Sequence, residues 1–310
     1  MSVNVLFAAR DAMWPIYEPT LKAAFAKAGI DADLRQDFAP EDVDYIIYAP
    51  SGAIRDLSPY VNCKAVLGLW AGVESIITNP TLTQPYARMV DTGLTEGMTE
   101  WVVGQVLRHH LELDLDICRT DAKWVAHIPP LARDRRIGVL GLGELGRSAA
   151  KALAQLNFQV SGWSRRAKEI DGITSHHGDA GLRDTLATSD ILVLLLPMTS
   201  ATENLLDADR IALMPKGAVV INPGRGPLID DAALLAALDQ DHLGHATLDV
   251  FRVEPLPEDH PFWAHPKVTV TPHIASETRP STASEVIAEN IRRGEAGEPL
   301  LHLVDKKQGY

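Results

Sequence analysis

The chain has 310 residues, 46% of them hydrophobic and 23% charged, which is enough apolar material for the cores of two globular domains. Its formal net charge is −12 and it contains no basic run, so we expect no nucleic-acid partner. Two isolated cysteines and the lack of any membrane-length apolar run argue against a disulfide framework, a metal site and a membrane span, and they fit a cytoplasmic protein.

Short apolar segments alternate with helical segments along the first part of the chain, as in a parallel sheet with helices on its faces. The first predicted helix carries Leu21 and Phe25 on its apolar face and ends at Gly29. We therefore predict an α/β domain at residues 1–94, and the polar residues 282–310 are expected to return and complete it. Its strands are predicted at residues 3–8, 32–35, 45–49, 65–69 and 88–91.

Residues 97–117 form the longest predicted helix, and apolar side chains such as Trp101, Val106 and Leu115 occupy more than one of its faces. Such a helix is expected to be buried on two sides, between domains or between subunits. Because its apolar surface exceeds what one domain can cover, we predict a symmetric homodimer that uses this helix.

A glycine-rich motif at residues 136–147 lies between an apolar strand and a helical segment and has the spacing G-x-G-x-x-G. Gly141 makes the turn out of the strand, Gly143 lets the backbone approach a pyrophosphate, and Gly146 lets the helix pack closely on the sheet. The N-terminus of that helix offers N–H groups and a partial positive charge to phosphates. The predicted cofactor contacts in this motif are Gly141, Gly143, Glu144, Leu145 and Gly146.

The alternation of strands and helices continues after the glycine motif. Strands are predicted at residues 137–140, 158–163, 191–196, 219–222, 246–250 and 268–271, and helices at 230–238 and 281–293. Six strands in this arrangement suit a Rossmann dinucleotide-binding domain, which we place at residues 95–281. The predicted fold class is therefore α/β, with two doubly wound parallel-sheet domains.

Three charged residues, Arg225, Glu254 and His273, each follow a predicted strand of the second domain. Because the carboxyl ends of parallel strands border one ligand crevice, we expect the three side chains to point toward the same place. Arg225 can bind a carboxylate and polarise the neighbouring carbonyl oxygen, and His273 can protonate that oxygen while a nicotinamide hydride reaches the carbon. Glu254 would orient the imidazole and favour its charged form. Each residue alone also fits an ordinary surface or turn position, so the prediction depends on their common placement.

The choice of cofactor can be predicted from the charges that follow strand 158–163. An NAD enzyme usually has an acidic residue there to bind the ribose 2′-hydroxyl, whereas this chain has Ser164, Arg165 and Arg166. A hydroxyl and two guanidinium groups suit a 2′-phosphate, so we predict that NADPH is preferred over NADH. The alternative is that both arginines are solvated turn residues.

At these motifs the sequence resembles the D-isomer-specific 2-hydroxyacid dehydrogenases, and in particular the branch that reduces glyoxylate and hydroxypyruvate. The resemblance covers essentially the whole chain. The segments that carry it are Asp91-Thr92-Gly93-Leu94-Thr95-Glu96, Trp163-Ser164-Arg165, Asp249-Val250-Phe251, Glu254-Pro255-Leu256-Pro257, Thr271-Pro272-His273 and the closing Gly309-Tyr310.

The resemblance implies specific roles for residues of this chain. Arg225, Glu254 and His273 would form the catalytic trio, Asp249 would hold the nicotinamide carboxamide, and the backbone at Ala71-Gly72 would bind the substrate carboxylate. The first domain would be a flavodoxin-like substrate domain, and helix 97–117 would serve the homodimer. The further contacts that we predict are Tyr48 and Trp70 for the substrate and Pro197 for the cofactor.

Two positions depart from the family pattern. Gly224 precedes the arginine where alanine or serine is usual, which adds backbone freedom but leaves Arg225 in place. Trp70 stands where many members have glycine, so the family pattern does not predict how large a substrate this pocket accepts.

The predicted function is the NADPH-dependent reduction of small 2-oxo acids, such as glyoxylate or hydroxypyruvate, to D-2-hydroxy acids. One alternative is a dinucleotide-sensing protein like the corepressors that resemble this family, but this chain lacks their long disordered tails and has the complete catalytic trio. A second alternative is a relative with other chemistry, such as a hydrolase that releases homocysteine, for which more cysteines and insertions in the first domain would be expected.

Overall fold

The computed structural model describes residues 2–306, and the chain divides into two compact units. The first unit is the chain up to Leu94 together with the segment that begins at Glu277. The second unit is Thr95–Ser276, so its end lies slightly earlier in the chain than the predicted boundary after residue 281.

The first unit contains a five-stranded sheet in which all neighbouring strands are parallel. Its order, β2-β1-β3-β4-β5, is that of flavodoxin-like folds and confirms the predicted fold class. Buried side chains such as Val5, Ile47 and Leu67 lie in its core. The last strand, predicted at residues 88–91, lies earlier in the chain, at Tyr86–Ala87. The strands are β1 (Val3–Ala8), β2 (Ala32–Arg35), β3 (Tyr45–Tyr48), β4 (Ala65–Gly68) and β5 (Tyr86–Ala87).

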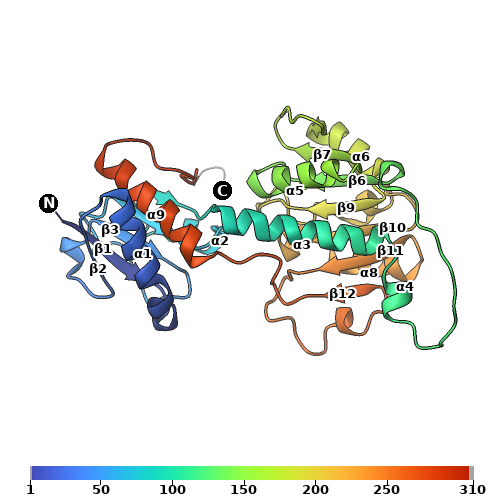
Figure 1. Cartoon of the computed structure of the whole chain (residues 1–310), viewed down its shortest axis with the longest axis horizontal. Coiled ribbons are helices and arrows are strands. Elements are labelled where there is room, and N and C mark those ends of the chain that lie inside the picture. Colours follow the sequence, from blue (N-terminus) through green and yellow to red (C-terminus); the bar gives the residue numbers. More distant parts are fainter. Residues whose placement is uncertain (1, 307–310) are drawn as a thin grey trace. The chain divides into compact units, whose positions relative to one another are not determined.

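Two helices that are far apart in sequence, α1 (Trp14–Ala28) and α9 (Pro280–Glu295), lie side by side against this sheet (Figure 1). Gly29 has a left-handed φ of 70° and ends α1 where the sequence predicts. Leu21 of α1 and Ile287 of α9 belong to one apolar cluster with β1 and β3. The unit also contains α2 (Glu74–Ile77) and short 3-10 helices at Asp11–Met13 and Pro40–Asp42.

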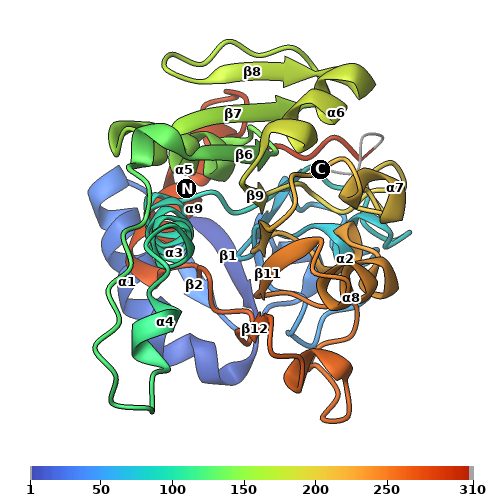
Figure 2. The ribbon, with the colours of Figure 1, turned by 90° about the vertical axis from the view of Figure 1, so that its right-hand side faces the viewer.

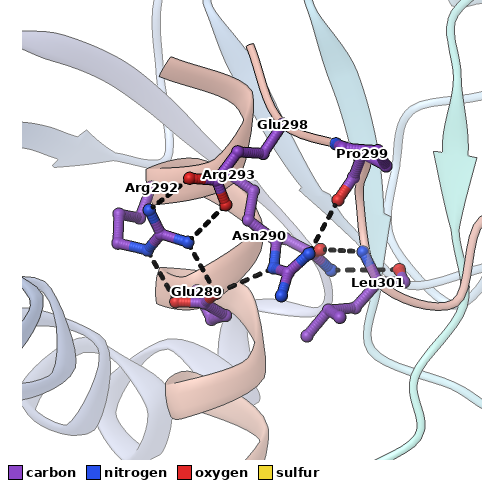
Figure 3. A network of polar contacts seen from close by, with 7 residues as sticks. All are labelled: Glu289, Asn290, Arg292, Arg293, Glu298, Pro299 and Leu301. Atoms are coloured by element: carbon purple, nitrogen blue, oxygen red, sulfur yellow. Dashed lines mark hydrogen bonds and ion pairs between the residues drawn. The ribbon is translucent and has the colours of Figure 1, made fainter. Parts of the chain in front are cut away.

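Ion pairs at the end of α9 guide the chain out of this helix (Figure 3). Arg292 contacts Glu289 at 2.9 Å and Glu298 at 2.7 Å, and Arg293 contacts Glu289 at 2.8 Å. Hydrogen bonds from the Arg292 guanidinium lower the pKa of Glu289 to about 2. Because these groups are near the surface, we expect them to contribute little to the free energy of unfolding. Their main effect is to hold the chain in one conformation where it leaves α9.

The segment beyond α9 returns to the edge of the sheet. The side chain of Asn290 accepts a hydrogen bond of 2.7 Å from the N–H of Leu301 (Figure 3), and the N–H of Val304 donates to the carbonyl of Tyr86 in β5 at 2.9 Å. The segment thus belongs to the same compact unit as the residues up to Leu94. The closing Gly309-Tyr310 of the family resemblance lies outside the described residues.

The second unit contains a seven-stranded parallel sheet of order β12-β11-β10-β9-β6-β7-β8. Counted from β6, this is the Rossmann order 3-2-1-4-5-6 with one strand added at the β12 edge. The sequence predicted six strands and missed β8 at the other edge (Figure 2), because Thr174–His177 is polar and has no apolar alternation. The strands are β6 (Arg136–Leu140), β7 (Gln159–Ser164), β8 (Thr174–His177), β9 (Ile191–Leu194), β10 (Ala218–Asn222), β11 (Leu243–Leu248) and β12 (Val268–Val270).

Helices cover both faces of this sheet, as a doubly wound fold requires. One apolar cluster contains Leu186 and Leu234 on one face, and another contains Val102 and Leu153 on the opposite face. The helices are α5 (Glu144–Gln155), α6 (Gly178–Thr188), α7 (Ala208–Ile211) and α8 (Asp231–Asp239), with 3-10 helices at Ala132–Asp134, Gly226–Leu228 and Pro261–Trp263.

The long helix predicted at residues 97–117 is wrong in its bounds. The structure has α3 (Thr92–His110), a turn, and the short helix α4 (Asp114–Ile117). Glu112 has a left-handed φ of 55°, and the side chain of Arg108 contacts Asp114 across the break at 2.8 Å. The apolar periodicity of the sequence continues through the turn, so this periodicity cannot predict where the helix breaks. Within residues 2–306, no helix is long and apolar enough to cross a membrane.

Candidate active site

The glycine motif forms the turn between β6 and α5. Gly141 has a φ of 107°, and a side chain there would collide with the carbonyl group of Leu195. A side chain at Gly146 would collide with the carbonyl oxygen of Gly141, so only glycine permits this close packing of helix on strand. At Gly143, the residue before α5, a Cβ would meet no atom within 4 Å. The backbone is therefore open at the helix N-terminus, where a pyrophosphate would bind.

The loop after β7 brings several basic residues to the end of that strand. Ser164 is buried and its hydroxyl donates to the carbonyl of Arg166 at 2.7 Å, while the side chains of Arg165 and Arg166 are exposed. Lys168, which is not among the residues predicted from the sequence, donates from Nζ to the carbonyl of Leu142 in the glycine turn at 2.6 Å. Its place in the same basic turn is the signal that could have identified it. The contact with Leu142 places the positive charge of Lys168 beside the glycine motif.

Arg225 follows β10 on a loop held by Asn222, the last residue of that strand. The Asn222 amide accepts from the N–H of Gly224 at 3.1 Å and donates to the carbonyl of Arg225 at 2.9 Å. Asn222 is almost fully buried. A Cβ at Gly224 would lie 2.8 Å from the carbonyl oxygen of Leu194, so limited space favours glycine at this position.

His273 and Glu254 form a close pair at the neighbouring strand ends. His273 Nδ1 lies 2.7 Å from Glu254 Oε2, and Glu254 Oε1 accepts a hydrogen bond of 2.8 Å from the N–H of Phe251. The Glu254 carboxylate can therefore accept a hydrogen bond from Nδ1–H, which fixes the orientation of the imidazole ring. The His273 side chain is 51% exposed, and its contact with Glu254 engages only Nδ1 of the two ring nitrogens.

The three strands that precede these residues are neighbours in the order β12-β11-β10 and are mutually parallel. Their carboxyl ends therefore lie at the same edge of the sheet, as predicted. Arg225, Glu254 and His273 thus follow strands that end at one edge of the sheet in the second unit.

Two other residues predicted for cofactor binding follow β11 and β9. Asp249 comes directly after β11 and is fully buried, with its carboxylate turned toward backbone and hydroxyl donors at residues 271–275. Pro197 comes after β9, and its carbonyl accepts a hydrogen bond of 2.8 Å from the hydroxyl of Thr202. No sequence pattern identifies the donors around Asp249, because they contact it only in the folded chain.

The predicted substrate contacts Tyr48, Trp70 and Ala71-Gly72 lie at the carboxyl ends of β3 and β4 in the first unit. Tyr48 is buried, and this burial raises the pKa of its hydroxyl. The turn at Trp70 is held by a hydrogen bond of 3.0 Å from the N–H of Met89 to the Trp70 carbonyl. The Trp70 side chain is exposed. Within the described part of the chain, no cluster of histidine, cysteine or acidic residues could hold a metal ion.

Comparisons with known proteins identify the family of this chain. The family described as D-isomer specific 2-hydroxyacid dehydrogenase, NAD binding domain, matches residues 102–275. Glyoxylate/hydroxypyruvate reductase A of Yersinia enterocolitica is 37% identical over 298 residues, which is 94% of each chain. Glyoxylate/hydroxypyruvate reductase A of Serratia proteamaculans is 40% identical over 255 residues, which is 80% of this chain and 82% of that protein.

Solved structures are similar over the full length of the chain. A D-isomer specific 2-hydroxyacid dehydrogenase from Xanthobacter autotrophicus Py2, in complex with NADPH and MES, has a TM-score of 0.93 and 39% identity with 100% of both chains covered. The NADPH-dependent glyoxylate/hydroxypyruvate reductase of Sinorhizobium meliloti, in complex with NADP and sulfate, has a TM-score of 0.85 and 34% identity with the same coverage. The chain therefore belongs to the D-isomer specific 2-hydroxyacid dehydrogenases and is an NAD(P)-dependent oxidoreductase.

Proposed function

We propose that this enzyme uses NADPH to reduce small 2-oxo acids of the glyoxylate and hydroxypyruvate type to D-2-hydroxy acids. The observation that carries the proposal is the 2.7 Å contact between His273 and Glu254 at the same sheet edge as Arg225. The names of the relatives in Yersinia enterocolitica and Sinorhizobium meliloti support this substrate class and cofactor.

The three residues at the sheet edge have complementary tasks in this reaction. Arg225 binds the substrate carboxylate through its planar guanidinium and draws electron density from the adjacent carbonyl. When bound, NADPH supplies the hydride that reduces the carbonyl carbon. His273 gives the proton from Nε2 to the carbonyl oxygen, and Glu254 holds the ring by Nδ1 so that Nε2 faces that oxygen. The products are the 2-hydroxy acid and NADP⁺.

The cofactor would be held by residues of the second unit. The glycine turn, with Glu144 and Leu145 at the start of α5, would bind the pyrophosphate, and Pro197 and Asp249 would lie beside the nicotinamide half. The side chains of Ser164, Arg165 and Arg166 would bind the 2′-phosphate, and Lys168 adds a further positive charge next to the glycine turn. This arrangement supports a preference for NADPH over NADH.

The first unit would supply the remaining substrate contacts. The backbone N–H groups at Ala71-Gly72 suit a carboxylate, and Tyr48 and Trp70 would limit the size of the substrate. We also propose that the enzyme is a homodimer formed through the region of α3 and α4, which replaces the single helix predicted at residues 97–117.

The test is to follow NADPH oxidation with glyoxylate and with hydroxypyruvate, and to determine the configuration of the glycerate formed from hydroxypyruvate. We expect turnover with both acids, D-glycerate as the product, and a loss of roughly 10²–10⁴ in kcat for His273→Ala. His177→Ala, which removes an exposed histidine from the same unit, is the matched control and should retain full activity. Tight NADPH binding without turnover of either acid would instead support the sensing protein.

A further inference from the structure

The carboxylate of Asp249 accepts hydrogen bonds from the loop that carries His273. Its Oδ1 accepts hydrogen bonds from the Thr271 hydroxyl at 2.6 Å and from the N–H of Ile274 at 2.9 Å. Its Oδ2 accepts from the N–H of Ala275 at 2.9 Å. These three donors lie on both sides of His273 in sequence, and Asp249 has no solvent-exposed surface.

The backbone conformation of His273 explains why this loop needs stabilising contacts. Its φ of 55° lies in the left-handed region, which a residue with a side chain adopts only where the surrounding structure holds it. The N–H of His273 also donates to the carbonyl of Thr271 at 3.0 Å, so the chain turns sharply at this position. Donors before and after the turn meet the same buried carboxylate, which therefore stabilises the turn.

The partner of His273 is held by a different contact. Glu254 is fixed by the N–H of Phe251, on the loop after β11, whereas the imidazole is carried by the loop after β12. The distance between His273 and Glu254 thus depends on how these two loops are aligned. Asp249 connects the two loops, because it follows β11 directly and its carboxylate accepts hydrogen bonds from the loop after β12. Its own N–H donates to the carbonyl of Asn222 at 3.0 Å, which extends the connection to the loop of Arg225.

We propose that Asp249 is a positioning residue for the acid catalyst: it holds His273 in the turn from which the imidazole reaches both Glu254 and the substrate. This inference rests on the proposed function, because it requires His273 to be the acid. It adds a second role to the place beside the nicotinamide half that the proposed function gives Asp249. The fully buried carboxylate with three donors from this chain supports the positioning role.

Thr271→Val gives the sharpest test, since it removes one donor to Asp249 and leaves the charge of Asp249 intact. We expect kcat with glyoxylate to fall about tenfold, the loss of one well-placed hydrogen bond, while the Kd for NADPH measured by fluorescence stays unchanged. The primary isotope effect with deuterated NADPH should rise because the chemical step becomes slower. In the cofactor-free protein, amide hydrogen exchange at Ile274 and Ala275 should become faster. Thr271→Ser retains the hydroxyl and should restore all of these values.

The matched control is Thr247→Val, which removes a buried hydroxyl two residues before Asp249. Thr247 contacts His109 rather than the His273 loop, so this change should affect thermal stability only. If Thr271→Val and Thr247→Val leave kcat equally unchanged, Asp249 does not position His273 through this loop. Asp249→Asn provides a second measurement, with an expected loss of about 10² in kcat.

Two outcomes separate the inference from the proposed function. If Asp249→Asn weakens NADPH binding while Thr271→Val has no effect, Asp249 is a cofactor ligand and the positioning role is wrong. If His273→Ala retains full activity, the proposed function itself fails, whatever the other variants show.

Discussion

Asn222 has the same relation to Arg225 that Asp249 has to His273. Its amide bridges the N–H of Gly224 and the carbonyl of Arg225, and it is 1% exposed. We predict that Asn222→Ala lowers stability by about 1–3 kcal/mol, because two buried backbone groups lose their partner. The KM for glyoxylate should rise about tenfold and the KM for NADPH should not. Steady-state kinetics and thermal unfolding measure both effects, and a rise confined to the KM for NADPH would contradict this role.

Arg165 provides a second prediction at the scale of single residues. The unmutated enzyme should prefer NADPH over NADH by at least about tenfold in kcat/KM, which corresponds to roughly 1.4 kcal/mol for a charge-assisted phosphate contact. Arg165→Ala should remove most of this preference and leave turnover with NADH nearly unchanged. Arg183→Ala, an exposed arginine on α6, is the control. Equal use of both cofactors by the unmutated enzyme would disprove the prediction.

Which site residues could be found from the sequence depends on how local their signal is. Arg225, Glu254 and His273 each follow an apolar strand, so the strand pattern alone places them at one sheet edge. The contact of Lys168 with Leu142 and the donors around Asp249 join residues that are far apart in the chain. No periodicity predicts such contacts, because they depend on how the loops fold.

At the scale of elements, the break between α3 and α4 brings together groups that a continuous helix would keep apart. Arg108 lies in the last turn of α3 and contacts Asp114 at the start of α4. The sequence predicts apolar surface through this region but not the left-handed residue Glu112, since nothing local requires it. Elements with strong apolar patterns, such as β9, were predicted well, whereas the polar edge strand β8 was missed.

Two histidines beside this break, His109 and His245, lead us to expect that the folded state loses stability at acid pH. His109 Nε2 lies 2.8 Å from the Thr247 hydroxyl, and His245 Nε2 lies 2.8 Å from the Thr269 hydroxyl, with the two rings 5.0 Å apart. Burial is the main cause that lowers the pKa of His109 to about 3 and that of His245 to about 4. The unfolded chain would take up protons near pH 6.5 while the folded chain does not, so stability present above pH 6.5 is lost as the pH falls toward 4.

Thermal unfolding between pH 7 and pH 4 tests this expectation. Each of these two part-buried histidines should contribute up to about 1.4 kcal/mol of destabilisation per pH unit inside that interval. His245→Gln removes one titrating group and should flatten the pH dependence, whereas His177→Gln, at an exposed position, should not. Identical slopes for the unmutated enzyme and His245→Gln would show that His245 is not the source of the acid sensitivity.

For the whole molecule, the sequence was sufficient to predict two parallel α/β sheets, because apolar strands alternate with helical segments throughout. It predicted the return of the C-terminal segment to the first unit from the need to cover that sheet. Nothing in the sequence of one chain shows directly whether two copies associate. That question depends on which apolar side chains the folded chain leaves exposed.

The segment around α4 leaves an unusual amount of apolar surface exposed in a single chain. Ile117 is 73% exposed, Trp124 is 98% exposed and Ile128 is 94% exposed, all in the second unit. Large apolar side chains that no other part of a chain covers usually mark an interface, and twofold symmetry would bury both copies of the segment at once. We therefore expect light scattering to give twice the 33.8 kDa of one chain at micromolar concentration.

Charge placed in this segment should separate the two copies. The double variant Trp124→Glu with Ile128→Glu should give a monomer, because two carboxylates would have to be buried at the interface without partners. Val61→Glu changes an apolar residue of the first unit that is 75% exposed, and this control should stay dimeric. A 33.8 kDa particle for the unmutated enzyme would contradict the dimer, and a dimer that persists in the double variant would place the interface elsewhere.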